Sequence, residues 1–177
     1  MTLNVFTGEG NYGVARVVEG HPSHAEILQH TLRETDKREC MISNVTPWRA
    51  LMTPLQNKEA ETFTALVDGE PVMMFGAVPE HDLVGSIWML CSEVVDKHPK
   101  TFIKWSPAFL DYFQQKYFLL QNVCPVEHYK TLTWLGYLGF MIMPTSFELN
   151  GHQVLRFVRC QDIDFMQFND DIRPVIS

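Results

Sequence analysis

The stretch TFTALVDGEPVMMFGAV (residues 62–78) decides the fold, because it holds two apolar runs joined by a two-residue turn. Thr62–Val67 and Pro71–Val78 have the length and residue types of strands. Asp68-Gly69 between them is typical of a hairpin turn, in which both central residues adopt positive φ. The sequence therefore predicts an antiparallel pair of strands, and we expect the second strand to end at Pro79.

Toward the N-terminus the pattern changes from strand to helix. Ala15–Glu19 is a short β-type run, and the residues after it break the strand. Ser23 is the predicted N-cap of a first helix that continues through charged residues to Glu39. Thr46 followed by Pro47 predicts the start of a second helix, because a threonine cap and a first-turn proline both favour helix initiation.

Toward the C-terminus the sequence predicts one more strand of the meander and then two helical crossovers. A broad apolar stripe with helical spacing covers residues 102–117, and Pro107 within it predicts a kink or the first turn. The turn Asn150-Gly151 predicts a final hairpin. The other predicted elements are a strand at Ser86–Cys91, a strand at Phe118–Val123, a helix at Val126–Tyr137 ended by Gly139, and strands at Phe140–Met143 and Val154–Val158.

This order, β-α-α-β-β-β-α-β-α-β-β, predicts an α/β (α+β) domain. The meander and the crossovers together give a mixed, mostly antiparallel sheet with helices on both faces. The predicted division is a flexible lead-in at residues 1–14, one domain at residues 15–159 and an acidic extension at residues 160–177. The extension is read either as a tail packed along its own sheet or as a segment that binds a partner.

Composition and charge exclude several classes of function. The net charge of −7 opposes binding to nucleic acid, which is usually recognised by a basic surface. The four cysteines are far apart and form no C-x-x-C pair, so no metal site is expected and the thiols are read as buried and reduced. No apolar run approaches the length of a membrane span, and the N-terminus has no secretory signal pattern. These features favour a location in the cytoplasm.

Two resemblances add to this interpretation. Trp134–Phe140, WLGYLGF, resembles the end of the fourth helix of GNAT acyltransferases, whose element order is the one predicted here. A longer series of motifs spans residues 15–159 and is similar to a family of short-tailed bacteriophage proteins related to the T7-type internal virion protein, a GNAT-like group. The motifs are LRETDKREC (32–40), PWRAL (47–51), DGEPVMMFG (68–76), WML (88–90), KHPKTF (97–102) and WLGYLGF (134–140).

The resemblance implies a phage protein associated with the virion, its assembly or its delivery. The implied partners are other virion proteins or host proteins, and the implied location is the virion or the host cytoplasm.

The resemblance to GNAT enzymes also indicates where a cofactor would bind. Those enzymes bind acyl-CoA with a glycine-rich loop whose backbone N–H groups point at the pyrophosphate. The corresponding residues 92–100, SEVVDKHPK, contain no glycine, two carboxylates and a proline. We therefore expect no cofactor, and the alternative is acetyl-CoA bound in a degenerate cleft. The candidate residues of that cleft are Leu90, Ser92, Lys97, Lys100 and His128.

The catalytic acid of GNAT enzymes is the second missing feature. Counted back from Gly139, the family's cofactor-contacting Asn and its acidic Tyr correspond to His128 and Leu135. Leucine donates no proton, so no catalytic residue is assigned. Cys91 at the end of a central strand is a weaker candidate nucleophile, because neither a base nor an oxyanion donor can be placed beside it.

Three functional hypotheses follow. The first is a non-catalytic GNAT-fold phage protein, a pseudoenzyme reused in the virion. The alternative is an acetyl-CoA-dependent N-acetyltransferase with a degenerate cofactor site, and it rests on the fold alone. The third is an inhibitor of a host protein, suggested by the acidic surface and the acidic C-terminal extension.

Overall fold

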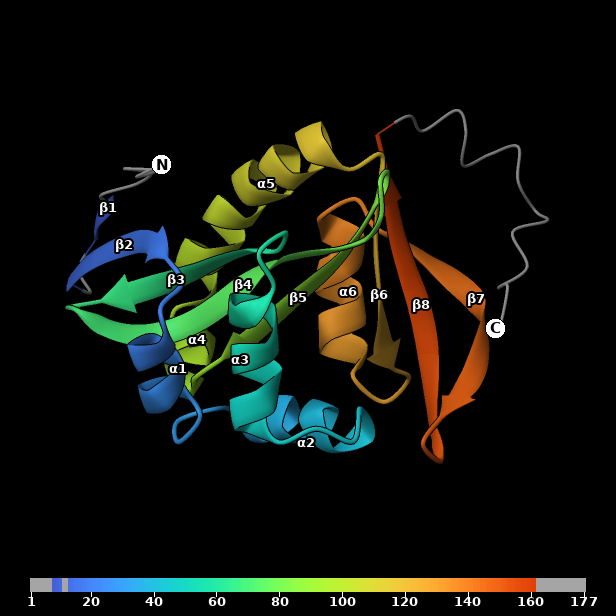
Figure 1. Cartoon of the computed structure of the whole chain (residues 1–177), viewed down its shortest axis with the longest axis horizontal. Coiled ribbons are helices and arrows are strands. Elements are labelled where there is room, and N and C mark those ends of the chain that lie inside the picture. The colour runs from blue at the N-terminus through green and yellow to red at the C-terminus, as the bar shows by residue number, and fades with distance from the viewer. Residues whose placement is uncertain (1–7, 11–12, 162–177) are drawn as a thin grey trace.

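The computed structural model describes residues 8–10 and 13–161, and within them the chain forms eight strands and six helices (Figure 1). In chain order the elements are β1 (Gly8–Gly10), β2 (Gly13–Glu19), α1 (Pro22–Leu28), α2 (Glu34–Ile42), α3 (Pro47–Gln56), β3 (Glu61–Val67), β4 (Glu70–His81), β5 (Val84–Cys91), α4 (Glu93–Lys97), α5 (Pro99–Lys116), β6 (Leu119–Pro125), α6 (Tyr129–Tyr137), β7 (Met141–Leu149) and β8 (His152–Cys160).

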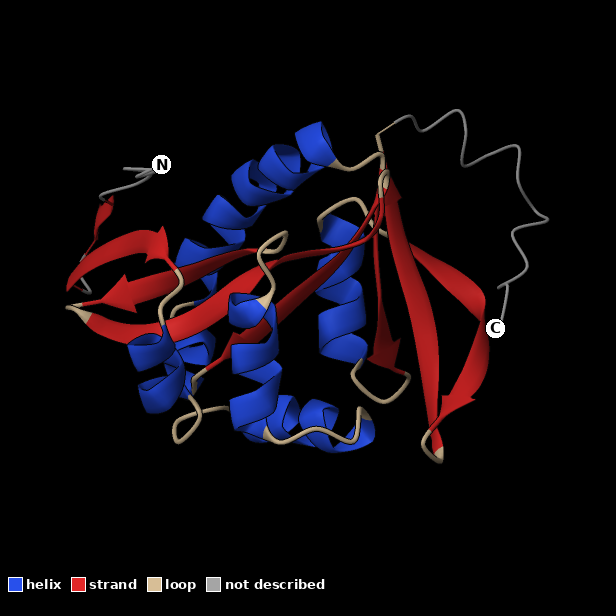
Figure 2. Cartoon of the chain, viewed as in Figure 1, coloured by secondary structure: helices blue, strands red, loops and turns tan. Residues whose placement is uncertain are grey.

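All eight strands belong to one twisted sheet with the order β1-β2-β3-β4-β5-β6-β8-β7. Every neighbouring pair is antiparallel except β5 and β6, which are parallel. Figure 2 shows the strands as two groups that come together where β5 meets β6. The predicted mixed, mostly antiparallel sheet is confirmed.

The hairpin of β3 and β4, with its turn at Asp68-Gly69, forms as predicted. Asp68 and Gly69 both have positive φ, 52° and 87°, as the turn requires. The prediction that Pro79 ends the second strand is wrong, because β4 continues to His81. Pro79 still lies opposite Gly85 of β5, and the register shifts between Pro79 and His81. An irregularity in the ladder accommodates a residue without an N–H.

The first predicted helix is two helices in the structure. The chain leaves α1 at Leu28 and re-enters a helix at Glu34, and Leu32 between them forms an isolated bridge with Ser92. Ser23 is not the N-cap; the His21 side chain accepts the Ser23 N–H instead, at 3.2 Å. Thr46 does cap α3, as predicted, by accepting the Arg49 N–H.

The sheet is buried on both faces, and β4 supplies side chains to each in turn. Met73 and Phe75 of β4 face one core, and Met74 between them faces the other, because successive strand residues point to opposite faces. The first core is built on α5 and α6, with Phe102, Trp105, Phe109, Phe113 and Leu135. The second is built on α1, α2 and α3, with Ala25, Leu28, Cys40, Leu51 and Leu90. The predicted placement of helices on both faces is thus confirmed.

Several boundaries and one helix differ from the sequence-based expectation. The short helix α4 was not predicted, and α6 begins at Tyr129 rather than at Val126. Within the expected lead-in, Gly8–Gly10 form β1 and pair with β2. The expected acidic extension begins at the last residue of β8, and from residue 162 onward it lies outside the described residues. Among the described residues, no helix is long and apolar enough to cross a membrane.

Candidate functional site

The site begins where the two parallel strands separate. β5 and β6 are paired only from Val84 to Ser86, opposite Leu119 to Gln121. At the next position the Asn122 side-chain amide donates to the Ile87 carbonyl, and its oxygen accepts the Val123 N–H. The side chain of Asn122 thus takes over where the backbone ladder stops. Beyond it the strands diverge and leave a gap in the middle of the sheet (Figure 1).

Alternate residues of β5 direct their backbone N–H and carbonyl groups toward this gap. The Ile87 carbonyl points that way, since it accepts from Asn122 on β6. Two residues past Met89, the N–H and carbonyl of Cys91 are bonded to Asp36 and to the Arg33 N–H, at 2.6 and 2.9 Å. Because hydrogen-bonding directions alternate along an antiparallel strand, the N–H and carbonyl of Met89 also face the gap.

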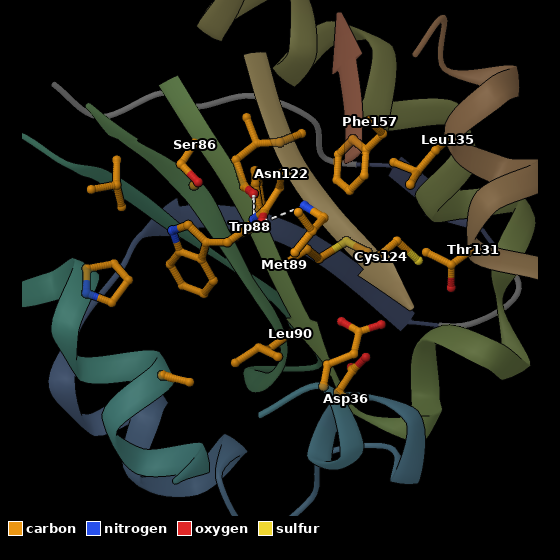
Figure 3. Close-up of a pocket in the computed structure, with 18 of the residues that line it drawn as sticks. Asp36, Ser86, Trp88, Met89, Leu90, Asn122, Cys124, Thr131, Leu135 and Phe157 are labelled. Carbon is orange, nitrogen blue, oxygen red and sulfur yellow. Dashed lines mark hydrogen bonds between the residues drawn. The ribbon is translucent and has the colours of Figure 1, made fainter. Parts of the chain in front are cut away.

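A cavity of about 610 Å³ lies in and around the gap. Figure 3 shows side chains that line it from α2, β5, β6, α6 and β8. The lining residues labelled there are Asp36, Ser86, Trp88, Met89, Leu90, Asn122, Cys124, Thr131, Leu135 and Phe157. Because residues from both cores contribute, the cavity reaches the two faces of the sheet through the gap.

An ion-pair network fixes α2 against the end of β5. The Arg33 guanidinium donates two hydrogen bonds to the Asp36 carboxylate, at 2.9 and 3.1 Å, and one to Asp96 at 2.8 Å. Asp36 is only 2% exposed and also accepts the Cys91 N–H. Burial raises the pKa of Asp36, and the hydrogen bonds from Arg33 oppose that shift. This network holds one wall of the cavity in place.

Residues 92–100, which correspond to the phosphate-binding loop of GNAT enzymes, contain α4 and the first residues of α5. Ser92 is the N-cap residue of α4; its side chain is buried, and its N–H bonds to the Val72 carbonyl. Glu93 and Asp96 lie in the first turn of α4, so carboxylates occupy that turn. Lys97 and Lys100 are exposed. Leu90 is the one of the five cleft candidates that lines the cavity.

His128, the last of those candidates, is paired with Glu39, a carboxylate from the charged stretch of α2. Its Nδ1 lies 2.8 Å from Glu39 Oε1, and its side chain is 7% exposed against 31% for Glu39. Burial raises the pKa of Glu39, and the hydrogen bond with His128 opposes the rise. Glu39 lines the cavity. The pair therefore places a proton acceptor at the cavity wall, which no sequence motif could reveal.

Leu135, which the resemblance to GNAT enzymes aligns with their acid-catalyst tyrosine, is buried and lines the cavity. Its side chain has no proton to donate. Tyr129 and Tyr137, the two tyrosines of α6, are 68% and 86% exposed. Their spacing from Leu135 puts both on other faces of the helix.

Two indole groups at the cavity have unused hydrogen-bonding capacity. Trp88 and Trp134 both line it, and each has a buried Nε1 with no partner among the described residues. A buried donor without a partner is costly, so such groups mark places where a bound molecule can supply an acceptor. The candidate nucleophile Cys91 is fully buried, and burial raises its pKa well above the usual range, which opposes a thiolate there.

Comparisons with known proteins support the fold. No protein-family model and no curated protein sequence matches the chain. Among solved structures, RimL, a ribosomal L7/L12 α-N-protein acetyltransferase in complex with coenzyme A, matches with a TM-score of 0.63 and 11% identity, over 87% of this chain and 97% of that one. The aminoglycoside acetyltransferase AAC(6')-Ib, in complex with ribostamycin and coenzyme A, matches with a TM-score of 0.64 and 12% identity, over 89% and 98%.

A third match covers almost the whole chain. The ribosomal-protein-S5-alanine acetyltransferase of Vibrio fischeri has a TM-score of 0.60 and 12% identity, over 96% of this chain and 100% of that one. The chain therefore has the GNAT fold. The expectation that it works without a cofactor is wrong, because proteins of this fold are seen with coenzyme A bound. That expectation rested on residues 92–100 alone, and it took no account of the gap between β5 and β6.

Proposed function

We propose that the chain is an acyltransferase that uses acetyl-CoA, or a similar acyl-CoA, to acylate an amine. The single observation that carries this proposal is the open gap between β5 and β6, which leads into a cavity of about 610 Å³. Coenzyme A is bound by RimL and by AAC(6')-Ib, which share the fold. The gap supports the same use here.

The cofactor's pantetheine arm is the part that this gap suits best. The arm is narrow and carries amide groups, and the N–H and carbonyl of Met89 face the gap with the geometry of an unfilled ladder. An extended arm that bonds to Met89 would take the place of a missing strand between β5 and β6. The indole N–H groups of Trp88 and Trp134 offer two further donors at the cavity.

The chain offers the diphosphate of the cofactor fewer favourable interactions than a glycine-rich loop would. The first turn of α4 carries Glu93 and Asp96, and these charges repel phosphate. The N-terminus of α5 and the exposed lysines Lys97 and Lys100 supply the positive charge in this segment. We therefore expect binding to depend on the arm more than on the diphosphate, with an affinity lower than a glycine-rich loop would give.

The acceptor amine must lose a proton as it attacks the thioester carbonyl. A new C–N bond forms, the C–S bond breaks, and the coenzyme leaves as a thiol. Glu39 lines the cavity and is hydrogen-bonded to His128, so this pair is the proposed proton acceptor. The cavity lining carries three carboxylates, Asp36, Glu39 and Glu80, and two arginines, Arg33 and Arg49, and Arg33 is paired with Asp36. The carboxylate of Glu39 can also attract an acceptor that arrives as an ammonium ion.

Binding and transfer are tested separately. Thermal melting with millimolar acetyl-CoA should raise the midpoint, because a ligand that binds only the folded state stabilises it. Thiol release from acetyl-CoA in the presence of amines should then identify acceptors. An unchanged midpoint, together with no thiol release above the rate without protein, would remove the support for an acyltransferase.

Glu39→Gln is the variant that tests the proton acceptor. The amide keeps the shape and a hydrogen bond to His128 but no longer accepts a proton, so we expect the rate of transfer to fall about 100-fold. Glu34→Gln, on the exposed face of the same helix, is the control and should change the rate less than about twofold. Equal rates for Glu39→Gln and the unaltered chain would show that the proton leaves by another route.

A second candidate function is a non-catalytic role in a bacteriophage virion or its assembly. It is favoured by the acidic first turn of α4 in the place of a phosphate loop, and by Leu135 in the place of the catalytic tyrosine. Mass spectrometry of purified particles tests it. Absence of the chain from particles and from assembly intermediates would count against this role.

A further inference from the structure

Three side chains with metal-ligating atoms meet beside the cavity, although their positions in the sequence suggest no metal motif. Glu39 comes from α2, Cys124 from β6, and His128 from the turn that precedes α6. Their carboxylate oxygen, thiol sulfur and ring nitrogen all lie within 4.8 Å of one another. We propose that Glu39, Cys124 and His128 form a binding site for a divalent zinc-type cation.

The donor set is the one that zinc prefers. Zinc takes sulfur, imidazole nitrogen and carboxylate oxygen at about 2.0–2.3 Å, with tetrahedral geometry. Ligand atoms around such an ion are about 3–4 Å apart. Small side-chain movements would therefore bring the three ligand atoms from their present separations to these distances. Magnesium and calcium prefer oxygen ligands and would not select a thiol and an imidazole. The sequence analysis expected no metal site because the cysteines form no C-x-x-C pair, whereas this site needs no such pair.

The charges around the cluster also favour a cation. Glu39 is itself one of the three residues, and a second carboxylate, that of the buried Asp36, lies one turn earlier on the same helix α2. Arg33 is bonded to Asp36 and Asp96, and Arg38 lies 3.5 Å from Glu127, so the nearby cations are already paired with other carboxylates.

A bound divalent ion would neutralise this arrangement. With Cys124 as a thiolate, Glu39 as a carboxylate and His128 neutral, the ligands carry two negative charges and the ion two positive ones. The thiol proton passes to solvent as the ion binds, and the ring nitrogen of His128 that binds the ion must carry no proton.

The fourth coordination position faces the cavity. Glu39 and Cys124 both line it, so water or a group of a bound molecule completes the tetrahedron from that side. One consequence rests on the proposed acyltransferase function: a bound ion occupies Glu39 and removes the proton acceptor, so zinc should inhibit transfer. The site itself does not depend on that function.

The test is a titration of untagged, fully reduced protein with Co²⁺, a spectroscopic substitute for Zn²⁺, in the absence of any acyl-CoA. We expect one ion per chain, a thiolate-to-cobalt charge-transfer band in the near ultraviolet and the intense visible bands of four-coordinate cobalt. Zn²⁺ should displace the cobalt and abolish both. No charge-transfer band at a several-fold excess of Co²⁺ would overturn the site, whatever the outcome of the acetyl-CoA experiments.

Matched variants assign the ligands. Cys124→Ser should abolish the charge-transfer band, and His128→Ala and Glu39→Gln should each weaken affinity at least about 100-fold. Cys160→Ser is the thiol control and Glu127→Gln the carboxylate control, and both should bind as the unaltered chain does. Circular dichroism of each metal-free variant checks that it is folded. A band that survives in Cys124→Ser, or affinity unchanged in both His128→Ala and Glu39→Gln, would contradict the assignment.

Discussion

At the scale of single residues, Asp36 connects the fold to the site. Its carboxylate is 2% exposed and binds both the Arg33 guanidinium and the Cys91 N–H. It thereby attaches α2, which carries Glu39, to the end of β5. A surface carboxylate could not do this, because water would compete for each of these hydrogen bonds.

Removing the Asp36 carboxylate should strongly destabilise the folded protein. Asp36→Ala leaves a buried N–H without an acceptor and Arg33 with one partner fewer, so we expect a loss of about 3 kcal/mol in the free energy of unfolding. Asp96→Ala, which removes the exposed partner of the same arginine, should cost less than about 1 kcal/mol. Urea denaturation measures both, and equal losses would show that the buried carboxylate has no special role.

Gly76 lies closer to the backbone of β3 than any side chain would allow. A Cβ atom there would lie 2.0 Å from the Glu61 carbonyl oxygen. Gly76→Ala should therefore destabilise the protein by about 2–3 kcal/mol, since the backbone of β3 would have to move. Gly136→Ala in α6 meets nothing within 4 Å and should be neutral or stabilising by up to about 1 kcal/mol. Thermal melting of the two variants compares them directly, and similar midpoints would contradict the packing described for β3 and β4.

At the scale of the elements, sequence patterns predicted most strands and helices. They did not predict where several of these elements end, or which distant residues the ends contact. The turns Asp68-Gly69 and Asn150-Gly151 were predictable, because positive φ restricts the residues that fit. The break between α1 and α2 was not, since Leu32 leaves the helix to pair with Ser92, sixty residues away. The site depends on contacts of this second kind.

The cleft candidates illustrate the same limit. The absence of glycine from residues 92–100 concerns one loop, whereas the gap results from the short pairing of β5 with β6. The pair of Glu39 and His128 joins residues 89 positions apart. Local composition cannot reveal such a contact, and neither residue belongs to a motif with a known chemical role.

Helix α6 provides a test of the cavity. Thr131 lines it, while Thr133 on the same helix is exposed and does not. Thr131→Trp should fill part of the cavity and weaken coenzyme A binding at least about tenfold, or about 1.4 kcal/mol. Thr133→Trp is the matched control and should bind within about twofold of the unaltered chain. Isothermal titration calorimetry measures both affinities; equal affinities would place the cofactor elsewhere.

At the scale of the whole molecule, the two cores on opposite faces of the sheet explain why the gap can exist. Each core is packed on its own set of helices, α5 and α6 on one side and α1 to α3 on the other. The sheet can therefore lose backbone pairing between β5 and β6 without losing its hydrophobic support. The composition and element order predicted this architecture, but not the cavity that it encloses.

The account as a whole depends on an acyl-CoA arm lying between β5 and β6. A crystal structure of the chain grown with coenzyme A tests this most directly. We predict an extended arm in the gap, with one amide group hydrogen-bonded to the Met89 backbone and the thiol directed into the cavity. Coenzyme A bound outside the gap, or β5 and β6 closed on each other without it, would contradict the account.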